Sequence, residues 1–342
     1  MISTESSANF RLVADIGGSN ARFGLLRGAE HTAIETRTLS TADFPTFAEA
    51  VGHYLQLCGT PTVDAAAVAI ANPVIGDLIQ MTNHHWSFSI EQTRQRLGLK
   101  RLLFLNDFAA LALSLPEIPA QDMRQLGGHD PVAAAPRVLV GPGTGLGVSA
   151  LVPVAGNRWA AVAGEGGHVT IGATNELEEK IIAFCRKEFG HVSAERLLSG
   201  MGLSNLHHAA CRIASRTYSA LTPAEITERG LSNEDPECAD ALSVFCSLLG
   251  SVAGNLALTL GALGGVYIGG GIVPRLGEYF HRSAFRSSFE AKGRFVEYLS
   301  RIPAYVIHAQ NPALIGAAIA LDSDAVGHSS NANARSRPLS SP

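Results

Sequence analysis

Two glycine-rich segments, well over a hundred residues apart, each stand between apolar runs that are typical of β-strands. The first spans residues 12–26 (LVADIGGSNARFGLL) and the second spans residues 138–152 (VLVGPGTGLGVSALV). Each segment predicts a strand, a tight polar turn and a second strand. Glycine lets backbone N–H groups approach an anion closely, and a hydroxyl in the turn adds another donor. Two such hairpins could hold a polyphosphate.

Glycines also turn ordinary hairpins, so either segment alone is ambiguous. The pair is more specific, because Asp15 in the first turn could hold a metal ion on the polyphosphate and Thr144 in the second adds a hydroxyl. A Walker A loop is excluded, since neither segment contains lysine. A dinucleotide fingerprint would open a helix, whereas the alternating glycines at 141, 143, 145 and 147 lead into a β-type run.

Length and composition restrict the class of protein. A chain of 342 residues suggests two domains or one large one, and 46% apolar with 16% charged residues indicates a globular protein. The net charge of -4 argues against a general nucleic-acid binder. The sequence has no run of eighteen apolar residues, so it predicts no membrane span. The first nine residues lack the pattern of a signal peptide. We therefore expect a cytoplasmic protein that binds neither nucleic acid nor membrane.

The five cysteines lie at positions 58, 185, 211, 238 and 246, with no C-x-x-C pair among them. An odd number without this spacing is typical of reduced, structural thiols. We expect neither disulfides nor zinc.

The rest of the chain alternates between apolar patterns typical of helices and apolar runs typical of strands. Apolar spacing predicts helices from residue 47, from residue 90 with Ser89 as N-cap, from residue 108, and over 176–189, 194–217, 239–260 and 311–321. Strand-like runs occupy 64–71, 101–105 and 264–268. This alternation predicts mixed sheets covered by helices, and the second glycine-rich hairpin predicts a second domain that repeats the plan of the first.

Asn106 and Asp107 follow a continuous apolar strand. Polar residues at the carboxyl ends of strands commonly line ligand sites in α/β proteins, but Asn and Asp also cap helices. The two interpretations are compatible, because a capping residue can also act as a base.

Three other segments are candidates for a site. Glu165 and His168 stand on a glycine-rich stretch that could shape a ligand site or could be an ordinary turn. Glu195 stands in the first turn of the predicted helix, at N3 or N2 according to which residue caps it. The glycines at 269–271 could let an adenine lie against bare backbone, or could simply turn the chain. His84, His85 and Trp86 are structural or pocket-wall candidates.

Taken in order, these residues resemble the bacterial glucokinase family of the proteobacterial, non-zinc type, over about residues 12–319. The resemblance is carried by seven blocks: residues 15–22 (DIGGSNAR), 81–88 (MTNHHWSF), 105–108 (LNDF), 143–147 (GTGLG), 164–169 (GEGGHV), 190–196 (GHVSAER) and 269–275 (GGGIVPR). One departure is Ser19, where the family usually has threonine; both carry a hydroxyl.

The resemblance implies an α/β, two-domain actin-like ATPase fold (a duplicated ribonuclease H-like fold) with an interdomain cleft. It implies transfer of phosphoryl from Mg-ATP to the 6-hydroxyl of glucose, a glycolytic step, by a homodimer. By likeness, Asp107 is the general base, and the sugar is bound by Asn106, Asp107, Glu165, His168 and Glu195. The nucleotide would meet Ala14, Asp15, Ile16, Gly17, Gly18, Ser19, Gly143, Thr144, Gly269, Gly270 and Gly271, with Asp15 near the magnesium ion.

The domain boundaries also follow from the resemblance. The small domain would combine residues 1–117 with 308–328, and the large domain would span 118–307. Residues 329–342 have no counterpart in the family, and their composition, rich in Ser, Asn, Arg and Pro, predicts a disordered tail.

Two alternatives remain open. A kinase for another hexose or an N-acetylhexosamine would share the phosphate hairpins. A sugar-sensing repressor would need an added helix-turn-helix, for which the hairpin beginning at Leu12 leaves little room.

Overall fold

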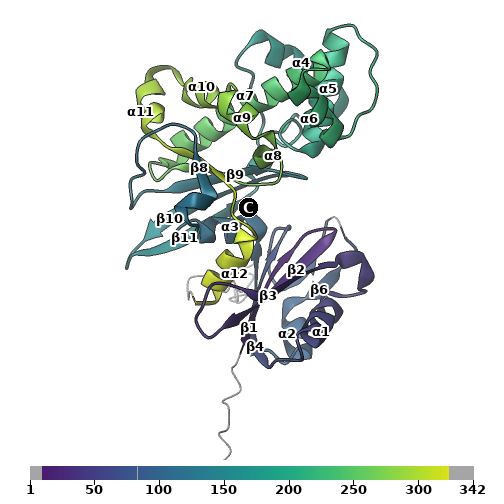
Figure 1. Ribbon diagram of the computed structural model, residues 1–342, viewed down its shortest axis with the longest axis vertical. Helices are drawn as coiled ribbons and strands as arrows, with labels where there is room; N and C mark the ends of the chain where they lie inside the picture. The colour runs from purple at the N-terminus through teal and green to yellow at the C-terminus, as the bar shows by residue number, and fades with distance from the viewer. Residues whose placement is uncertain (1–9, 83, 323–342) are drawn as a thin grey trace, which may run out of the picture. The chain divides into compact units, whose positions relative to one another are not determined.

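The computed structural model describes residues 10–82 and 84–322, and the chain divides into two compact units (Figure 1). Unit 1 comprises Met1–Pro116 and Asn311–Pro342, and unit 2 comprises Glu117–Gln310. Residues 308–310 and Glu117, which the resemblance assigns to the small domain, group with unit 2, where the His308 N–H donates to the Asp122 carbonyl at 2.7 Å. The proposed tail at 329–342 lies outside the described residues.

Unit 1 is built on a sheet whose described strands run in the order β3-β2-β1-β4-β7. The first glycine-rich segment forms the predicted hairpin, since β1 and β2 pair antiparallel. β4 and β7 run parallel to β1, with Ile16, Ile70 and Asn106 in register, so the first turn and the end of β7 lie at the same edge. The strands are β1 (Phe10–Ile16), β2 (Asn20–Arg27), β3 (Ile34–Ser40), β4 (Val63–Ile70) and β7 (Arg101–Asn106).

Helices cover this sheet, and two of them pack unusually closely. A Cβ added at Gly316 of α12 would overlap the Ala110 carbonyl of α3, so glycine permits the contact between these helices. Ser89 caps α2 as predicted, accepting from the Gln92 N–H at 3.1 Å. The remaining elements are η1 (Thr41–Asp43), α1 (Phe47–Leu57), β5 (Leu78–Gln80), β6 (Ser87–Ser89), α2 (Ile90–Arg96), α3 (Asp107–Ser114) and α12 (Pro312–Asp322).

The sheet of unit 2 repeats that of unit 1. Its described strands run β11-β10-β9-β12-β13-β8, so an antiparallel three-stranded meander is again followed by parallel strands, here with β8 added at the edge. The architectural repeat expected from the two hairpins is therefore present. The strands are β8 (Met123–Gln125), β9 (Arg137–Pro142), β10 (Leu146–Val154), β11 (Arg158–Gly164), β12 (Val266–Ile268) and β13 (Ala304–Ile307).

Unit 2 carries more helix than unit 1. The helix expected over 194–217 is shorter than predicted, because residues 194–199 form turns and α5 begins at Gly200 after the Ser199 cap. The helices are η2 (Ala120–Asp122), η3 (Gly166–His168), α4 (Glu176–Phe189), α5 (Gly200–Ile213), α6 (Pro223–Ser232), α7 (Pro236–Leu260), α8 (Val273–Leu276), α9 (Glu278–Arg282), α10 (Phe285–Glu290), η4 (Gly293–Phe295) and α11 (Val296–Arg301).

Helix α7 is long and apolar enough to cross a membrane by length and composition. Within unit 2, however, 72% of its most apolar window is buried. Its neighbours include α5, α6 and α10. These contacts are those of a core helix, and they account for its apolar composition.

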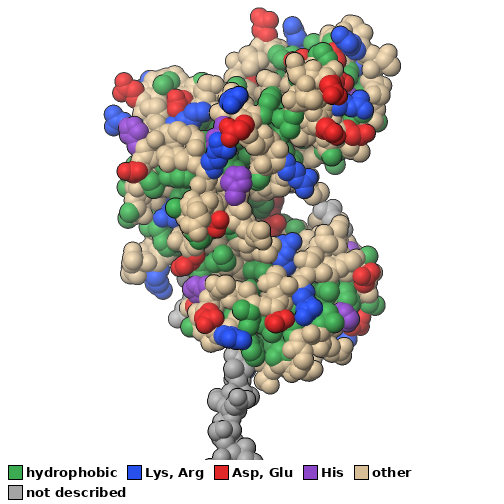
Figure 2. All heavy atoms as spheres, viewed as in Figure 1, with side chains coloured by type: hydrophobic (Ala, Val, Ile, Leu, Met, Phe, Trp, Pro, Cys, Tyr) green, Lys and Arg blue, Asp and Glu red, His purple; other side chains and the backbone are tan. Residues whose placement is uncertain are grey.

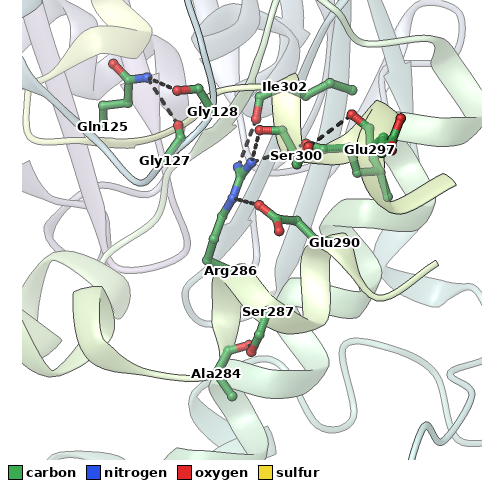
Figure 3. Close-up of polar contacts among 11 residues, drawn as sticks. Gln125, Gly127, Gly128, Ala284, Arg286, Ser287, Glu290, Glu297, Ser300 and Ile302 are labelled. Carbon is green, nitrogen blue, oxygen red and sulfur yellow. Dashed lines mark hydrogen bonds and ion pairs between the residues drawn. The ribbon is translucent and has the colours of Figure 1, made fainter. Parts of the chain in front are cut away.

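Arg286 of α10 joins the outer helices of unit 2 to the chain that enters β13 (Figure 3). Its Nη atoms donate to the Ile302 carbonyl at 2.8 Å and to the Ser300 carbonyl at 2.9 Å, and its Nε pairs with Glu290 at 2.5 Å. The carbonyls at the end of α11 therefore receive the cationic partner that a helix C-terminus favours.

On the face in Figure 2, basic and acidic side chains are interspersed, and no side of either unit shown there is uniformly basic. This agrees with the net charge of -4.

Candidate functional site

Thr41 forms two hydrogen bonds with the backbone of the turn between β1 and β2. The Thr41 Oγ donates to the Gly18 carbonyl at 2.8 Å, and the Thr41 N–H donates to the Ser19 carbonyl at 3.1 Å. Both bonds use carbonyls, so they consume no N–H donor of the turn. The Gly17 N–H does donate, to the Asn20 carbonyl at 2.9 Å. The amides of Gly18 and Ser19 are therefore better candidates for an anion than that of Gly17.

Asp15 lies one residue before the end of β1 and faces Arg22 across the hairpin. Arg22 Nη1 donates to Asp15 Oδ2 at 3.3 Å, and the Asp15 side chain retains 27% exposure. Burial raises the pKa of the Asp15 carboxyl, and the Arg22 guanidinium partly offsets this. Ala14 and Ile16 are buried within the sheet, so only their backbone could contribute to a site.

Asn106 and Asp107 form the junction between β7 and α3. Asn106 is the N-cap, and its Oδ1 accepts from the Phe108 N–H at 3.0 Å and the Ala109 N–H at 3.1 Å. Asp107 Oδ1 accepts from the Phe108 N–H at 2.9 Å and from Asn106 Nδ2 at 3.1 Å. The capping role is thus established for Asn106, while Asp107 is held as an acceptor at the positive end of the helix.

The turn between β9 and β10 is closed differently. The Gly143 N–H donates to the Gly145 carbonyl at 2.8 Å, and the Gly143 carbonyl accepts from the Gly200 N–H at the start of α5, also at 2.8 Å. Both polar groups of the Gly143 backbone are therefore engaged. Thr144, at the tip, is exposed. Its hydroxyl and the neighbouring amides are the parts of this turn that remain suited to an anion.

Glu195 reaches this second turn from a distant part of the chain. It is not in the first turn of a helix, as we had expected, because the chain forms non-helical turns until Gly200. Its Oε2 accepts from the Leu146 N–H at 2.9 Å, and its own N–H donates to the Gly167 carbonyl at 2.8 Å. A Cβ at position 145 would lie 2.5 Å from Glu195 Oε2, so a larger residue there would displace this carboxylate.

Glu165 is the N-cap of the short helix η3 that follows β11, and His168 is the last residue of that helix. Their side chains are 58% and 59% exposed, and the nearest carboxylate and imidazole atoms are 4.0 Å apart. The glycines between them are required by close packing: a Cβ at Gly166 would lie 2.8 Å from Val148, and one at Gly167 would overlap the Leu146 carbonyl. The backbone is thus pressed against β10 while both polar side chains face outward.

The glycines at 269–271 follow β12 and pass over the end of β9. The Gly269 N–H donates to the Val140 carbonyl at 3.0 Å. Gly270 has φ +76°, and a Cβ there would overlap the Pro142 carbonyl, so this position needs glycine for two reasons. Gly271 has open space around it. A flat ligand could approach the backbone here.

Comparison with known proteins gives the family of the chain. The glucokinase family model matches residues 12–324. A glucokinase from Chromobacterium violaceum is 56% identical over 308 residues, which is 90% of this chain and 88% of the relative. The chain belongs to the glucokinase family.

Solved glucokinase structures share the fold. One from an Antarctic psychrotroph is 34% identical, has a TM-score of 0.83, and aligns over 92% of this chain and 99% of its own. A ROK family glucokinase from Streptomyces griseus, solved with glucose and AMPPNP, is 20% identical with a TM-score of 0.60, over 91% and 99% of the two chains. The α/β fold is therefore the actin-like fold of these sugar kinases, as the resemblance implied.

Each unit brings together part of the expected site. In unit 1, the first turn and the Asn106–Asp107 junction lie at the same edge of the sheet, with the end of β4 between them. Unit 2 gathers the other candidates near the carboxyl end of β9, namely Gly143, Thr144, Glu165, His168, Glu195 and the glycines at 269–271.

Two residues that contact the candidate site, Arg22 and Thr41, were not predicted from the sequence. Arg22 pairs with Asp15, and the register of the predicted hairpin would have placed them opposite each other. Thr41 anchors the first turn from η1, and no local signal in the sequence indicates this. Of the candidates at 84–86, Trp86 has a structural contact, since it is 2% exposed and donates to the Phe44 carbonyl at 2.9 Å.

Proposed function

We propose that this glucokinase transfers the γ-phosphoryl group of ATP to the 6-hydroxyl of D-glucose, with Mg²⁺ bound to the nucleotide. The observation that carries the proposal is Asp107, a carboxylate fixed at the first position of α3 in a chain of this family. The relative from Streptomyces griseus, solved with glucose and AMPPNP, supports this pair of substrates.

Asp107 is the proposed general base. The attacking hydroxyl must lose its proton as it bonds to phosphorus, and a positioned carboxylate accepts that proton. The Phe108 N–H and the Asn106 amide hold one oxygen of Asp107, which orients the carboxylate before substrate arrives. Asn106, whose Oδ1 caps α3, offers its Nδ2 as a donor to a sugar oxygen.

Glu165, His168 and Glu195 are the proposed acceptors for the other sugar hydroxyls. A carboxylate accepts from two vicinal hydroxyls at once, which suits an uncharged sugar. The exposure of Glu165 and His168 leaves both side chains open to a ligand. Glu195 already accepts from the Leu146 N–H, so it ties sugar recognition to the second turn.

The two turns are the proposed phosphate contacts. The amides of Gly18 and Ser19, the Ser19 hydroxyl, Thr144 and the Gly145 amide are the donors that suit polyphosphate oxygens. The residues fit a magnesium ion, because Asp15 offers a partly exposed carboxylate oxygen, the ligand type Mg²⁺ prefers. The ion would neutralise phosphate charge. The bare backbone at 269–271 is the proposed adenine contact.

The test is the Asp107→Ala variant, assayed by coupled ADP detection with glucose. We expect kcat to fall by about 10²- to 10⁴-fold with an unchanged melting temperature. Asp64→Ala is the matched control, since Asp64 lies near the opposite end of β4 in a surface pair with Lys100 at 3.3 Å. Normal turnover by Asp107→Ala would remove this residue from the mechanism.

A hexose panel in the same assay tests the substrate. We expect glucose to give the highest kcat/KM, and a higher value for mannose, fructose or an N-acetylhexosamine would replace glucose in the proposal. A homodimer working in the cytoplasm belongs to the same proposal, and a molar mass of one chain, 35.9 kDa, by light scattering would contradict the dimer.

A further inference from the structure

A buried cluster of metal-ligating groups lies in the helices of unit 2. His207 and Cys211 are one turn apart on α5, and Asp235 and Cys238 begin α7. A ring nitrogen of His207, a carboxylate oxygen of Asp235 and the Cys238 Sγ lie within 4.8 Å of one another. His207 is 2% exposed, Cys211 4% and Cys238 0%. None of these residues has a part in the proposed transfer.

The imidazole of His207 is incompletely satisfied. Its Nε2 lies 3.4 Å from the Cys211 Sγ, whereas its buried Nδ1 has no hydrogen-bond partner. A buried nitrogen without a partner destabilises the fold, and a ligand at that nitrogen would remove the cost.

Asp235 brings negative charge to the same place. Its Oδ1 accepts from the Glu237 N–H at 3.0 Å and the Cys238 N–H at 3.1 Å, as the N-cap of α7. Glu237 is not a further ligand, because its carboxylate pairs with the Arg216 Nε at 3.0 Å. The donors are thus one imidazole, one carboxylate and one thiol, carried by α5 and by the start of α7.

We propose that His207, through its unpartnered Nδ1, Asp235 and Cys238 bind a zinc ion in unit 2. Imidazole, thiolate and carboxylate are ligands that zinc takes, whereas magnesium prefers oxygen ligands alone. Binding displaces the thiol proton to solvent, because the thiolate is the ligand. The sequence did not predict this site, because its one cysteine ligand stands in the spacing D-x2-C and the expectation of no zinc was based on the absence of C-x-x-C pairs.

The ion would fasten α5 to the start of α7. This matters beyond the cluster, since the N–H of Gly200, at the first residue of α5, supports the second turn through the Gly143 carbonyl. His207 is seven residues further along the same helix, about 10 Å at 1.5 Å per residue. Fixing α5 therefore stabilises the backbone on which that turn rests.

The experiment is a zinc titration of the untagged, reduced full chain in competition with a chromophoric chelator. We expect the wild type to bind one equivalent of zinc and to melt at a higher temperature when it is bound. Cys238→Ser and His207→Gln should each weaken binding by at least about 100-fold. Cys246→Ser is the matched control, because Cys246 is also 0% exposed on α7 but lies outside the cluster.

Cobalt substitution supplies a second measurement that does not depend on the variants folding. Cobalt bound at the cluster should show a thiolate-to-metal charge-transfer band, and Cys238→Ser should abolish it. The proposal is overturned if the wild type takes up no zinc, or if zinc binds equally well to Cys238→Ser. It is also overturned if cobalt binds without that band, or if the purified wild type holds a Cys211–Cys238 disulfide in place of the ion.

Discussion

The two glycine-rich turns occupy equivalent places in two sheets of the same strand order, yet they are built by different means. The first turn carries its own acid, Asp15, which is balanced by Arg22 across the hairpin. The second turn has no acid of its own and receives the carboxylate of Glu195, which lies 49 residues beyond Leu146. Two turns with the same backbone fold therefore differ in their electrostatics, because the charged side chain at each turn comes from whichever segment packs against it.

The largest effect is expected from removing Asp15, the acid of the first hairpin, which tests the electrostatic difference between the two turns. Asp15→Asn keeps the shape and an acceptor for Arg22, but it removes the charge proposed to face magnesium. We expect kcat to fall by about 10²- to 10³-fold, the size of effect seen when one preorganised electrostatic group is lost. Magnesium titrations of the coupled assay check this. An unchanged magnesium dependence would separate Asp15 from the metal.

Asp15→Asn should increase thermal stability, although it should lower kcat. Because burial raises the pKa of Asp15 in the folded state, its ionised form costs stability at neutral pH. This cost decreases as pH falls through the raised folded pKa and is gone below the ordinary value of 3.8. Without nucleotide, Asp15→Asn should therefore melt above the wild type at neutral pH, with the difference closing toward that value. Melting curves against pH measure it, and a variant less stable at neutral pH would contradict the account.

A smaller effect is expected from a matched pair of glycine substitutions. Gly145→Ala places a Cβ 2.5 Å from Glu195 Oε2 and should displace that carboxylate, whereas a Cβ at Gly17 meets only the Asn20 carbonyl at 3.7 Å. We expect Gly145→Ala to lower kcat/KM for glucose by about 10- to 100-fold. Gly17→Ala should keep its melting temperature and raise only the KM for ATP. Equal glucose kinetics in the two variants would show that Glu195 does not bind sugar.

The smallest effect is expected at Ser19. Ser19→Thr retains the hydroxyl at an exposed position of the first turn. We expect kcat/KM for ATP to stay within about twofold of the wild type. Ser19→Ala, which removes the donor, should raise the KM for ATP further. Identical kinetics for the threonine and alanine variants would exclude the hydroxyl from phosphate binding.

Much of the site could be predicted because its signals are local. The hairpins follow from glycines between β-type runs, and the Asn106–Asp107 junction follows from an apolar strand that stops at two polar residues. Glu195 was found as a candidate but placed in a helix, because the apolar spacing of residues 194–199 resembles helix although the chain there forms turns. Spacing reports which side chains are buried, and buried turns share that property with helices.

The amino-acid sequence by itself determined the strand–turn–strand segments, the family and the candidate acids, because each depends on neighbouring residues. Only the tertiary structure decided what those groups contact: Thr41 behind the first turn, Glu195 on the second, and the thiols of Cys211 and Cys238 beside His207. These contacts join residues far apart in the chain, and burial and hydrogen bonding between such residues arise only when the helices and sheets pack.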